Sequence, residues 1–480
     1  MHCRMRVGFF VVFLVGIPLS SAVWAYSGGS GTPMDPFKIA HADDLMLLGA
    51  TPSDYHGHFV LVSDIDLDPN RPGGRVFEQA LIAPIRNINL DPRFSGTFDG
   101  NGHVLRNIVF AGDSYLGLFG AIGVGGVVSS LGLERVWVVS QQGPSAGLAA
   151  MSWGTIDGCF VTGFVDGESV DAGGLVGSQQ GGHVSSCYTE GAIAGTAQLG
   201  GLVGSLQAGG ISNCYSWADV EGRDAVGGLV GRLDQGDLFH CYSSGAVRGD
   251  RLEGGLLGDS RGGSVTGCFW DLGTSGQPTS DGGTPASTVQ MQGQELYLAA
   301  GWDFLDEQVN GSQEIWQRVA GDTYPRLTRV AVSIPDPTLK RFIEATLGKA
   351  NPTRRDMLSL RRLELVHGDV ASLVGLEAAN HLEYLDLRAN RIVSVAPLAG
   401  LHDLTVLGLS DNQIRNVTAL AGLTQLVELG IGGNLVWDIR PLRNLVRLRM
   451  LSLYDNQITD IDALRSLLVL EILWLNNNFV

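Results

Sequence analysis

Five cysteines recur along the chain, and their thiols are the groups with the most obvious capacity for metal or redox chemistry. They are Cys159, Cys187, Cys214, Cys241 and Cys268, at steps of 28, 27, 27 and 27 residues. Zinc favours cysteine pairs only two to four residues apart, so this spacing does not indicate a metal site. In-register strands would hold the side chains parallel, which suits disulfides poorly. We therefore predict reduced thiols that pack as small hydrophobic side chains.

Other candidate chemistry is sparse. Asp64, Asp66 and Asp68 alternate, so an extended segment would place three carboxylates on one face; a calcium ion could bind there, although we favour a solvated edge. Gly143-Pro-Ser-Ala-Gly147 matches G-x-S-x-G but lacks the strand–turn–helix context that a nucleophilic serine needs. No compact acid/base set stands out. We expect no enzyme and no cofactor. The alternative is a carbohydrate-active enzyme, of the polysaccharide lyase or glycoside hydrolase type.

Charge and glycine divide the chain into two parts. The 480 residues carry a formal net charge of −17. Residues 26–328 hold 33 acidic and 14 basic side chains and 56 of the 67 glycines, whereas residues 329–480 hold 16 acidic and 16 basic side chains. Two domains of different construction follow. The acidic excess argues against nucleic acid as a partner, because its phosphates are bound largely by basic side chains.

The amino terminus has the order of a secretory signal. Arg4 and Arg6 precede the apolar run from Val7 to Leu19, and small residues lead to Ala25. We predict a signal peptide over residues 1–25, with an uncleaved anchor as the alternative. The mature protein is then exported, to the extracellular space or the cell surface, and has no transmembrane segment.

A 27-residue repeat organises the first domain. A Gly-Leu step recurs at the following positions: Gly117, Gly147, Gly174, Gly201, Gly228 and Gly255. Each unit is predicted to contain three short β segments, for example Gly201–Ser205, Gly210–Ser216 and Ala218–Glu221. A fixed period with β content and no helical pattern indicates a mainly-β parallel β-helix, with repeats over about residues 117–270. A propeller ranks second, because its blades need about 40 residues.

The repeat also resembles a known motif. Gly-Leu-Val-Gly at residues 174–177, 201–204 and 228–231, with Cys-Tyr downstream, resembles the GLUG motif of large secreted bacterial proteins. The flanking segments agree: Phe94 to His103 is similar to the opening coil of such β-helices, and Gly301 to Leu327 to their closing segment. The resemblance covers roughly residues 28–328. It implies a β-helix fold and export, and no reaction.

The second domain repeats every 22 residues. The pattern L-x-x-L-x-L-x-x-N predicts a leucine-rich-repeat solenoid of six repeats over residues 360–480, the last incomplete. Its first leucines are Leu360, Leu382, Leu404, Leu426, Leu448 and Leu470, and its asparagines, which we expect to bond the backbone at turns, are Asn390, Asn412, Asn434, Asn456 and Asn478. Residues 329–359 are expected to form a linker and a cap helix, with Asp336 before Pro337 and Gly348 at its end. The repeats resemble the internalin-like repeats of bacterial surface proteins. Because the sixth repeat stops at Val480, we expect a fragment of a longer protein or a truncated reading frame.

Side chains between the leucines should point outward on the concave face of this solenoid. The candidate partner-binding residues are Tyr384, Asp386, Arg388, Glu428, Met450, Tyr454, Ile472 and Trp474. Aromatic and arginine side chains are frequent anchors of protein interfaces. We predict an exported binding or adhesion protein, in which a β-helix stalk presents the leucine-rich repeats to a protein or surface ligand. We expect a monomer.

Overall fold

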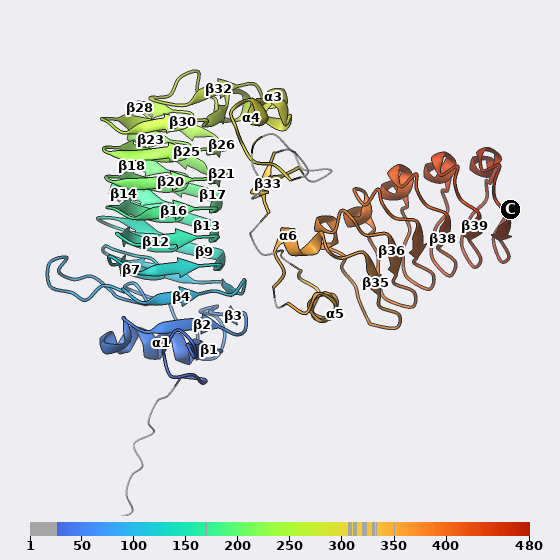
Figure 1. Ribbon diagram of the computed structural model, residues 1–480, viewed down its shortest axis with the longest axis horizontal. Helices are drawn as coiled ribbons and strands as arrows, with labels where there is room; N and C mark the ends of the chain where they lie inside the picture. Colours follow the sequence, from blue (N-terminus) through green and yellow to red (C-terminus); the bar gives the residue numbers. More distant parts are fainter. Residues whose placement is uncertain are drawn as a thin grey trace, which may run out of the picture.

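The chain forms two solenoids (Figure 1). This computed structural model describes residues 26–168, 170–305, 310, 314–318, 324–328, 332, 334–349 and 351–480. The predicted signal peptide lies outside the described residues. A stacked β structure occupies the first part of the chain, and an arc of six strands with short helical turns occupies the second. Both predicted solenoid classes are confirmed.

The first solenoid is a parallel β-helix of about six coils. Its strands pair in register along four sides. One sheet contains β1 (Phe37–Ile39), β2 (His58–Leu61), β4 (Thr97–Asp99), β8 (Val127–Ser129), β12 (Thr155–Asp157), β16 (His183–Ser185), β20 (Gly209–Ser212), β25 (Gly236–Phe239) and β30 (Ser264–Thr266). The next contains β7 (Phe119–Ile122), β11 (Ala149–Ser152), β15 (Val176–Gln179), β19 (Val203–Leu206), β24 (Val230–Leu233) and β29 (Leu257–Ser260).

The other two sheets complete the coil. The third contains β10 (Ser145–Ala146), β14 (Val170–Gly173), β18 (Ala197–Gly200), β23 (Asp224–Gly227) and β28 (Arg251–Gly254). The fourth contains β3 (Ile65–Asp66), β5 (Val104–Arg106), β6 (Val109–Gly112), β9 (Gly132–Ser140), β13 (Phe160–Gly167), β17 (Tyr188–Ala194), β21 (Tyr215–Ser216), β22 (Asp219–Glu221), β26 (Tyr242–Ser243), β27 (Val247–Arg248), β31 (Phe269–Asp271) and β32 (Thr284–Ala286).

The prediction of three β segments in each unit is wrong. The coil that begins at Gly201 runs through β19, β20, β21, β22 and β23. The predicted segment Gly210–Ser216 is divided into β20 and β21, and β23, which the prediction did not include, ends at the glycine corner Gly227. At Gly227, a Cβ atom would lie 2.0 Å from the carbonyl oxygen of Val230, so only glycine allows the chain to turn this tightly.

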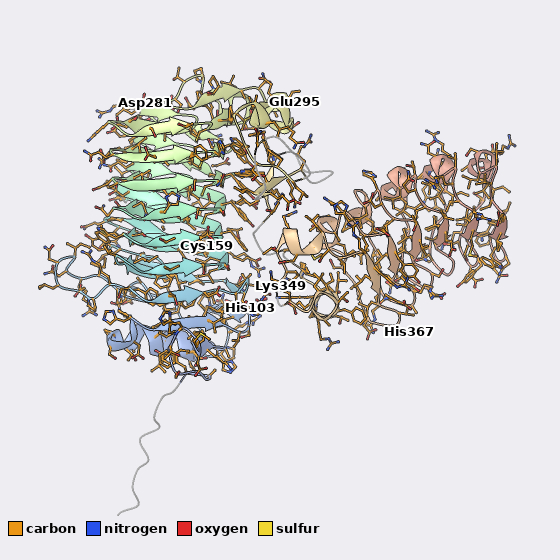
Figure 2. The ribbon with its side chains drawn as sticks, in the orientation of Figure 1. His103, Cys159, Asp281, Glu295, Lys349 and His367 are labelled. Atoms are coloured by element: carbon orange, nitrogen blue, oxygen red, sulfur yellow. The ribbon has the colours of Figure 1, made fainter. Side chains whose placement is uncertain are left out.

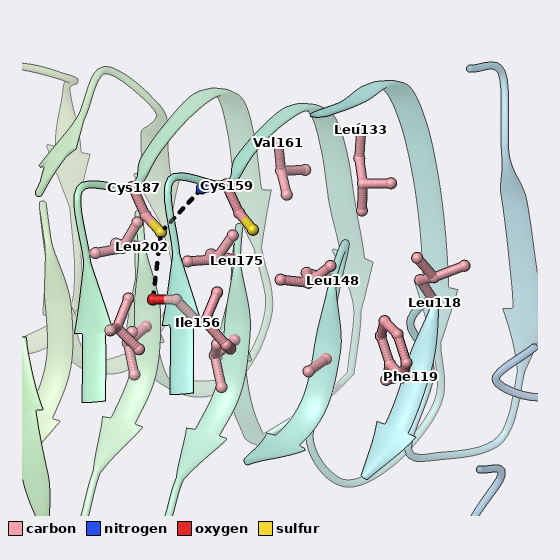
Figure 3. Close-up of a cluster of buried hydrophobic side chains, with 14 of the residues drawn as sticks. Leu118, Phe119, Leu133, Leu148, Ile156, Cys159, Val161, Leu175, Cys187 and Leu202 are labelled. Atoms are coloured by element: carbon pink, nitrogen blue, oxygen red, sulfur yellow. Dashed lines mark hydrogen bonds between the residues drawn. The ribbon is translucent and has the colours of Figure 1, made fainter. Parts of the chain in front are cut away.

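The core of the β-helix is a set of ladders, in which each coil contributes the same residue type. The leucine of every Gly-Leu step is fully buried, as are the neighbouring cysteines. Figure 3 shows Leu148, Leu175 and Leu202 beside Cys159 and Cys187. The backbone N–H of Cys159 donates to the Sγ atom of Cys187 at 3.3 Å, and that thiol donates to the carbonyl of Ile156 at 3.8 Å.

Helices and short strands lie at the ends of the β-helix. Near its first strands are α1 (Ala42–Ala50) and η1 (Pro52–Asp54). After its last coil come α2 (Leu272–Ser275), α3 (Thr288–Gln292), α4 (Glu295–Ala299), β33 (Trp316–Gln317) and β34 (Arg326–Leu327). This closing segment covers a stack of tyrosines, Tyr188, Tyr215 and Tyr242, whose ring centroids lie 4.9 and 5.1 Å apart. Trp316 of the closing segment packs against Tyr242.

The second solenoid has one parallel sheet and short helical turns. Its strands are β35 (Arg362–Glu364), β36 (Tyr384–Asp386), β37 (Val406–Gly408), β38 (Glu428–Gly430), β39 (Met450–Ser452) and β40 (Ile472–Trp474). Its helices are α5 (Pro337–Leu347), α6 (Arg354–Met357), η2 (Leu376–Ala378), η3 (Ala396–Leu398), η4 (Thr418–Gly422), η5 (Arg440–Asn444) and η6 (Asp462–Ser466). Leu339 and Ile343 of α5 are fully buried against the first repeats, which closes that end of the core.

Polar contacts join the two solenoids. The Nζ atom of Lys340 on α5 lies 3.4 Å from a carboxylate oxygen of Asp64, and Asn351 donates to the carbonyl of Asn101 at 3.0 Å. His103 lies on the side of the β-helix that faces the second solenoid (Figure 2). The joint is therefore made by side chains far apart in sequence.

Candidate binding site on the strand face

The outward side chains of β35 to β40 form one continuous surface, which we call the strand face. In-register pairing aligns Asp386, Gly408, Gly430, Ser452 and Trp474 in a single row across five strands. Alternation along each strand sends these residues outward, while the leucines between them fill the core in the first four of these strands: Leu385, Leu407, Leu429 and Leu451. The alternation that places leucines in the core of each repeat therefore also places the intervening residues on this surface.

The asparagine ladder holds the strands at this spacing. The Asn412 amide nitrogen donates to the carbonyls of Leu387 and Leu409, both at 3.0 Å, and its oxygen accepts from the backbone N–H of Ile392 at 2.9 Å. The other four predicted asparagines, Asn390, Asn434, Asn456 and Asn478, repeat these contacts. Each amide therefore satisfies backbone groups at the turn, and these groups belong to two adjacent repeats, which was not predicted from the sequence.

A pocket of about 470 Å³ lies on the strand face, and we call it the strand-face pocket. Of the predicted binding residues, those that line it are Tyr384, Asp386, Arg388, Glu428, Met450, Tyr454 and Trp474. Ile472, which is 40% exposed on β40, lies outside it. The structure therefore brings seven of the eight predicted side chains into one hollow.

Two glycines that sequence reasoning missed form the floor of this pocket. Gly408 and Gly430 occupy the row between Asp386 and Ser452, where their lack of side chains leaves the hollow. A Cβ at Gly408 would lie 2.8 Å from Asp386, and one at Gly430 would lie 3.1 Å from the Ser410 hydroxyl. The signal was present in the sequence, because both glycines fall at an outward position of consecutive repeats.

Asp386 and Arg388 form an ion pair at one wall of the pocket. The Arg388 guanidinium donates to both carboxylate oxygens of Asp386, at 2.6 to 3.0 Å. This hydrogen bonding raises the pKa of Arg388. Asp386 is only 3% exposed, so the expectation that it is displayed for a partner is corrected: Arg388 covers it.

The opposite wall is aromatic. The Tyr454 ring lies over Gly432, where a Cβ atom would come within 2.3 Å of it, and its hydroxyl lies 3.4 Å from Asp411. Burial, together with the Asp411 charge, raises the pKa of Tyr454. Trp474 and Met450 continue this wall. The pocket thus combines aromatic surface with carboxylates.

The carboxylates considered for calcium have other partners. Asp64 accepts from His103, Arg106 and Lys340 at 3.0 to 3.4 Å. Burial alone would raise its pKa, but these groups hold the pKa of Asp64 well below its ordinary value. Asp66 binds Arg71 and Asn107, and Asp68 binds Asn70. These residues form neither a shared cation site nor a purely solvated edge; Asp64 belongs to the joint between the solenoids.

The five cysteines are free thiols in the core. Burial raises the pKa of Cys159 and Cys187 well above the ordinary value, which keeps these thiols protonated and poor as nucleophiles or metal ligands. Within the described residues, no group of three or more His, Cys, Asp or Glu side chains is arranged to hold a metal ion.

A second hollow, of about 550 Å³, lies where the fourth sheet of the β-helix meets the start of the second solenoid. Two of its carboxylates are paired with arginines: Glu134 bonds Arg106 at 2.9 Å, and Glu190 lies 3.9 Å from Arg326. Both pairs lie within the β-helix and its closing segment, where each carboxylate is bound by an arginine.

Comparison with known proteins matches both repeat types. The GLUG motif family matches residues 222–248, and leucine-rich-repeat families match residues 380–436 and 446–480. Halomucin from Haloquadratum walsbyi is 34% identical over 155 residues, which are 31% of this chain and 2% of halomucin. A protein of Evansella cellulosilytica, whose name describes it as a Gly-rich membrane protein, is 31% identical over 33% of this chain and 18% of its own length.

The chain thus spans well under two thirds of either relative. Among solved structures, an internalin from Listeria monocytogenes is 30% identical, with a TM-score of 0.25, over 29% of this chain and 56% of the internalin. None of the helices in the described part of the chain has the length and apolar content needed to cross a membrane. Its own coils and repeats and the matching models together show that the chain carries a GLUG motif within a parallel β-helix, followed by C-terminal leucine-rich repeats.

Proposed function

We propose that this chain is an exported binding protein, in which the leucine-rich repeats capture a partner protein and the β-helix serves as a rigid stalk. The strand-face pocket carries this proposal, because it gathers Tyr384, Tyr454 and Trp474 around a hollow. Aromatic side chains that close over a pocket are the usual energetic centres of protein interfaces.

The relatives support the coarser part of the proposal, a surface or binding protein. One is halomucin and the other is named as a membrane protein. Adhesion at a bacterial cell surface is the finer form that we propose, with the protein acting as a monomer.

The binding experiment compares the full chain with three variants, Tyr384→Ala, Tyr454→Ala and Trp474→Ala, on an array of surface and matrix proteins. A partner found with the parent chain should lose more than about tenfold in affinity with at least one variant. Trp437→Ala is the matched control, since Trp437 is 60% exposed but does not line the pocket. Equal binding by the three variants and the parent would remove the strand face from the proposal.

We also propose that the protein is not an enzyme. The pairing of Glu134 and Glu190 with arginines supports this, because a general acid or base needs a side chain free to exchange a proton. Incubation of the full chain with a panel of acidic and neutral polysaccharides tests it. We expect no release of reducing ends or unsaturated products; sustained turnover would favour the carbohydrate-active alternative.

A further inference from the structure

The strand-face pocket has an excess of negative charge. Its ionisable side chains, apart from the tyrosines, are Asp386, Asp411, Glu428 and Arg388. Arg388 is engaged by Asp386, so its charge is already compensated. Asp411 and Glu428 remain, and Glu428 has no ion-pair partner among the described residues. A bound group of positive charge would therefore be attracted electrostatically.

The aromatic walls suit a cation as well. Tyr384, Tyr454 and Trp474 border the pocket, and the faces of such rings attract guanidinium and ammonium groups. The strand face already holds one example, because the guanidinium carbon of Arg362 lies 3.5 Å from the ring centroid of Tyr384. A second basic side chain could bind beside it in the same way.

A serine hydroxyl at the floor offers a further hydrogen-bonding group to a polar ligand. Ser452 is 9% exposed and lines the pocket next to Gly430. Its hydroxyl makes no hydrogen bond to any side chain or backbone group within the described ranges. A hydrogen-bond donor such as a guanidinium or ammonium N–H could donate to this oxygen.

We propose that the strand-face pocket receives a basic side chain, arginine or lysine, from a segment of a partner protein. The inference rests on the binding function proposed above and deepens it. The side chain's stem packs on Met450 and Trp474, and its charged end lies over Gly408 and Gly430 toward Glu428. The glycine floor provides the depth, since a larger residue in that row would fill the hollow.

The experiment uses the full chain with ¹³C-methyl methionine and follows the methyl signal of Met450, assigned with Met450→Leu. The probe is the peptide acetyl-Gly-Ser-Arg-Ser-Gly-amide, and the control carries citrulline, a neutral isostere of arginine. We expect saturable shifts with the arginine peptide, and binding at least about tenfold weaker with citrulline. Raising the salt concentration should weaken the arginine complex.

Two variants test the residues named. Glu428→Gln should lower the affinity for the arginine peptide by about three- to tenfold. Glu383→Gln, on the same solenoid but outside the pocket, should leave that affinity unchanged. Gly430→Leu should abolish binding by filling the floor. The other methionine signals report whether each variant keeps its fold. Equal affinity for the arginine and citrulline peptides, no effect of Glu428→Gln, or preference for an acidic peptide would overturn the inference.

The two proposals fail separately. A partner protein that needs Tyr454 or Trp474 but is indifferent to Glu428→Gln would leave the binding function standing and refute the basic side chain. Peptide binding at Met450 without any partner protein that depends on the strand face would refute the binding function instead.

Discussion

Ionisation of the Asp171 carboxyl group destabilises the folded protein. Asp171 lies in β14 with φ +63, and its Oδ1 atom is buried without a hydrogen-bond partner in the described part of the chain. Burial raises the pKa of Asp171 to about 6; Asp234 adds to this increase and Arg232 opposes it. In the sequence, nothing distinguishes Asp171 from the other aspartates of this acidic domain, because its burial is produced by the neighbouring coils.

Replacing this carboxyl should stabilise the protein near neutral pH. The native pKa is above the ordinary value of 3.8, so the folded protein holds a proton that the unfolded chain releases. Stability therefore falls as pH rises from about 4 to about 6. We expect Asp171→Asn to raise the free energy of unfolding at pH 7 by about 1–3 kcal/mol, and to change it little at pH 4. Asparagine also tolerates the positive φ.

Urea unfolding at both pH values measures this effect. Asp250→Asn, at an exposed position of the same domain, serves as the control and should leave the pH dependence unchanged. A gain of equal size at pH 4 and pH 7 would mean that the carboxyl's charge is not the cause.

At the scale of elements, the repeats were largely predictable. A 22-residue period with leucine and asparagine at fixed positions specifies strand, turn and contact partner together, and the structure shows one strand per repeat in register. The β-helix coils were predicted less well, because two-residue strands such as β21 have no recognisable alternation. Backbone contacts at glycine corners, not side-chain patterns, define the strands there.

The asparagine ladder should couple neighbouring repeats. Asn434 accepts from Ile414 at 2.9 Å and donates to Leu409 and Ile431 at 3.0 and 3.1 Å, and it is buried. Asn434→Ala would leave these backbone groups without partners, at a cost of about 2–4 kcal/mol. We expect the second solenoid to unfold at a lower urea concentration, which hydrogen exchange of the backbone amides in its strands would measure. Asn444→Ala, exposed on η5, is the control, and equal midpoints for the two variants would contradict the role of the ladder.

For the whole molecule, polar contacts between residues far apart in the sequence join the two solenoids. Asp64 meets Lys340 from a position 276 residues earlier, and Asn101 meets Asn351 across 250 residues. In the sequence, Asp64 belongs to an alternating acidic run that suggested calcium or a solvated edge. Only the folded chain shows that the Asp64 carboxylate binds the side chains of a lysine, an arginine and a histidine where the two solenoids meet.

Removing this carboxylate should loosen the joint. Asp64→Asn leaves Lys340 and Arg106 without their shared anion, so we expect the solution scattering of the full chain to indicate a wider spread of overall dimensions. In the parent protein, high salt should produce part of the same change, since screening weakens the contact. Asp259→Asn, which breaks a local pair with Arg261, should leave the scattering curve unchanged. Identical curves for parent and Asp64→Asn would show that other contacts hold the joint.

The sequence by itself determined both solenoid classes, the order of the domains and the set of outward residues on the leucine-rich repeats. Periods of 27 and 22 residues carry that information because each repeat packs only on its neighbours, so local patterns specify local contacts. The tertiary structure decided that Gly408 and Gly430 open a pocket, that Arg388 covers Asp386, and that Asp64 joins the solenoids. These features depend on contacts between strands or across hundreds of residues, which no single repeat encodes.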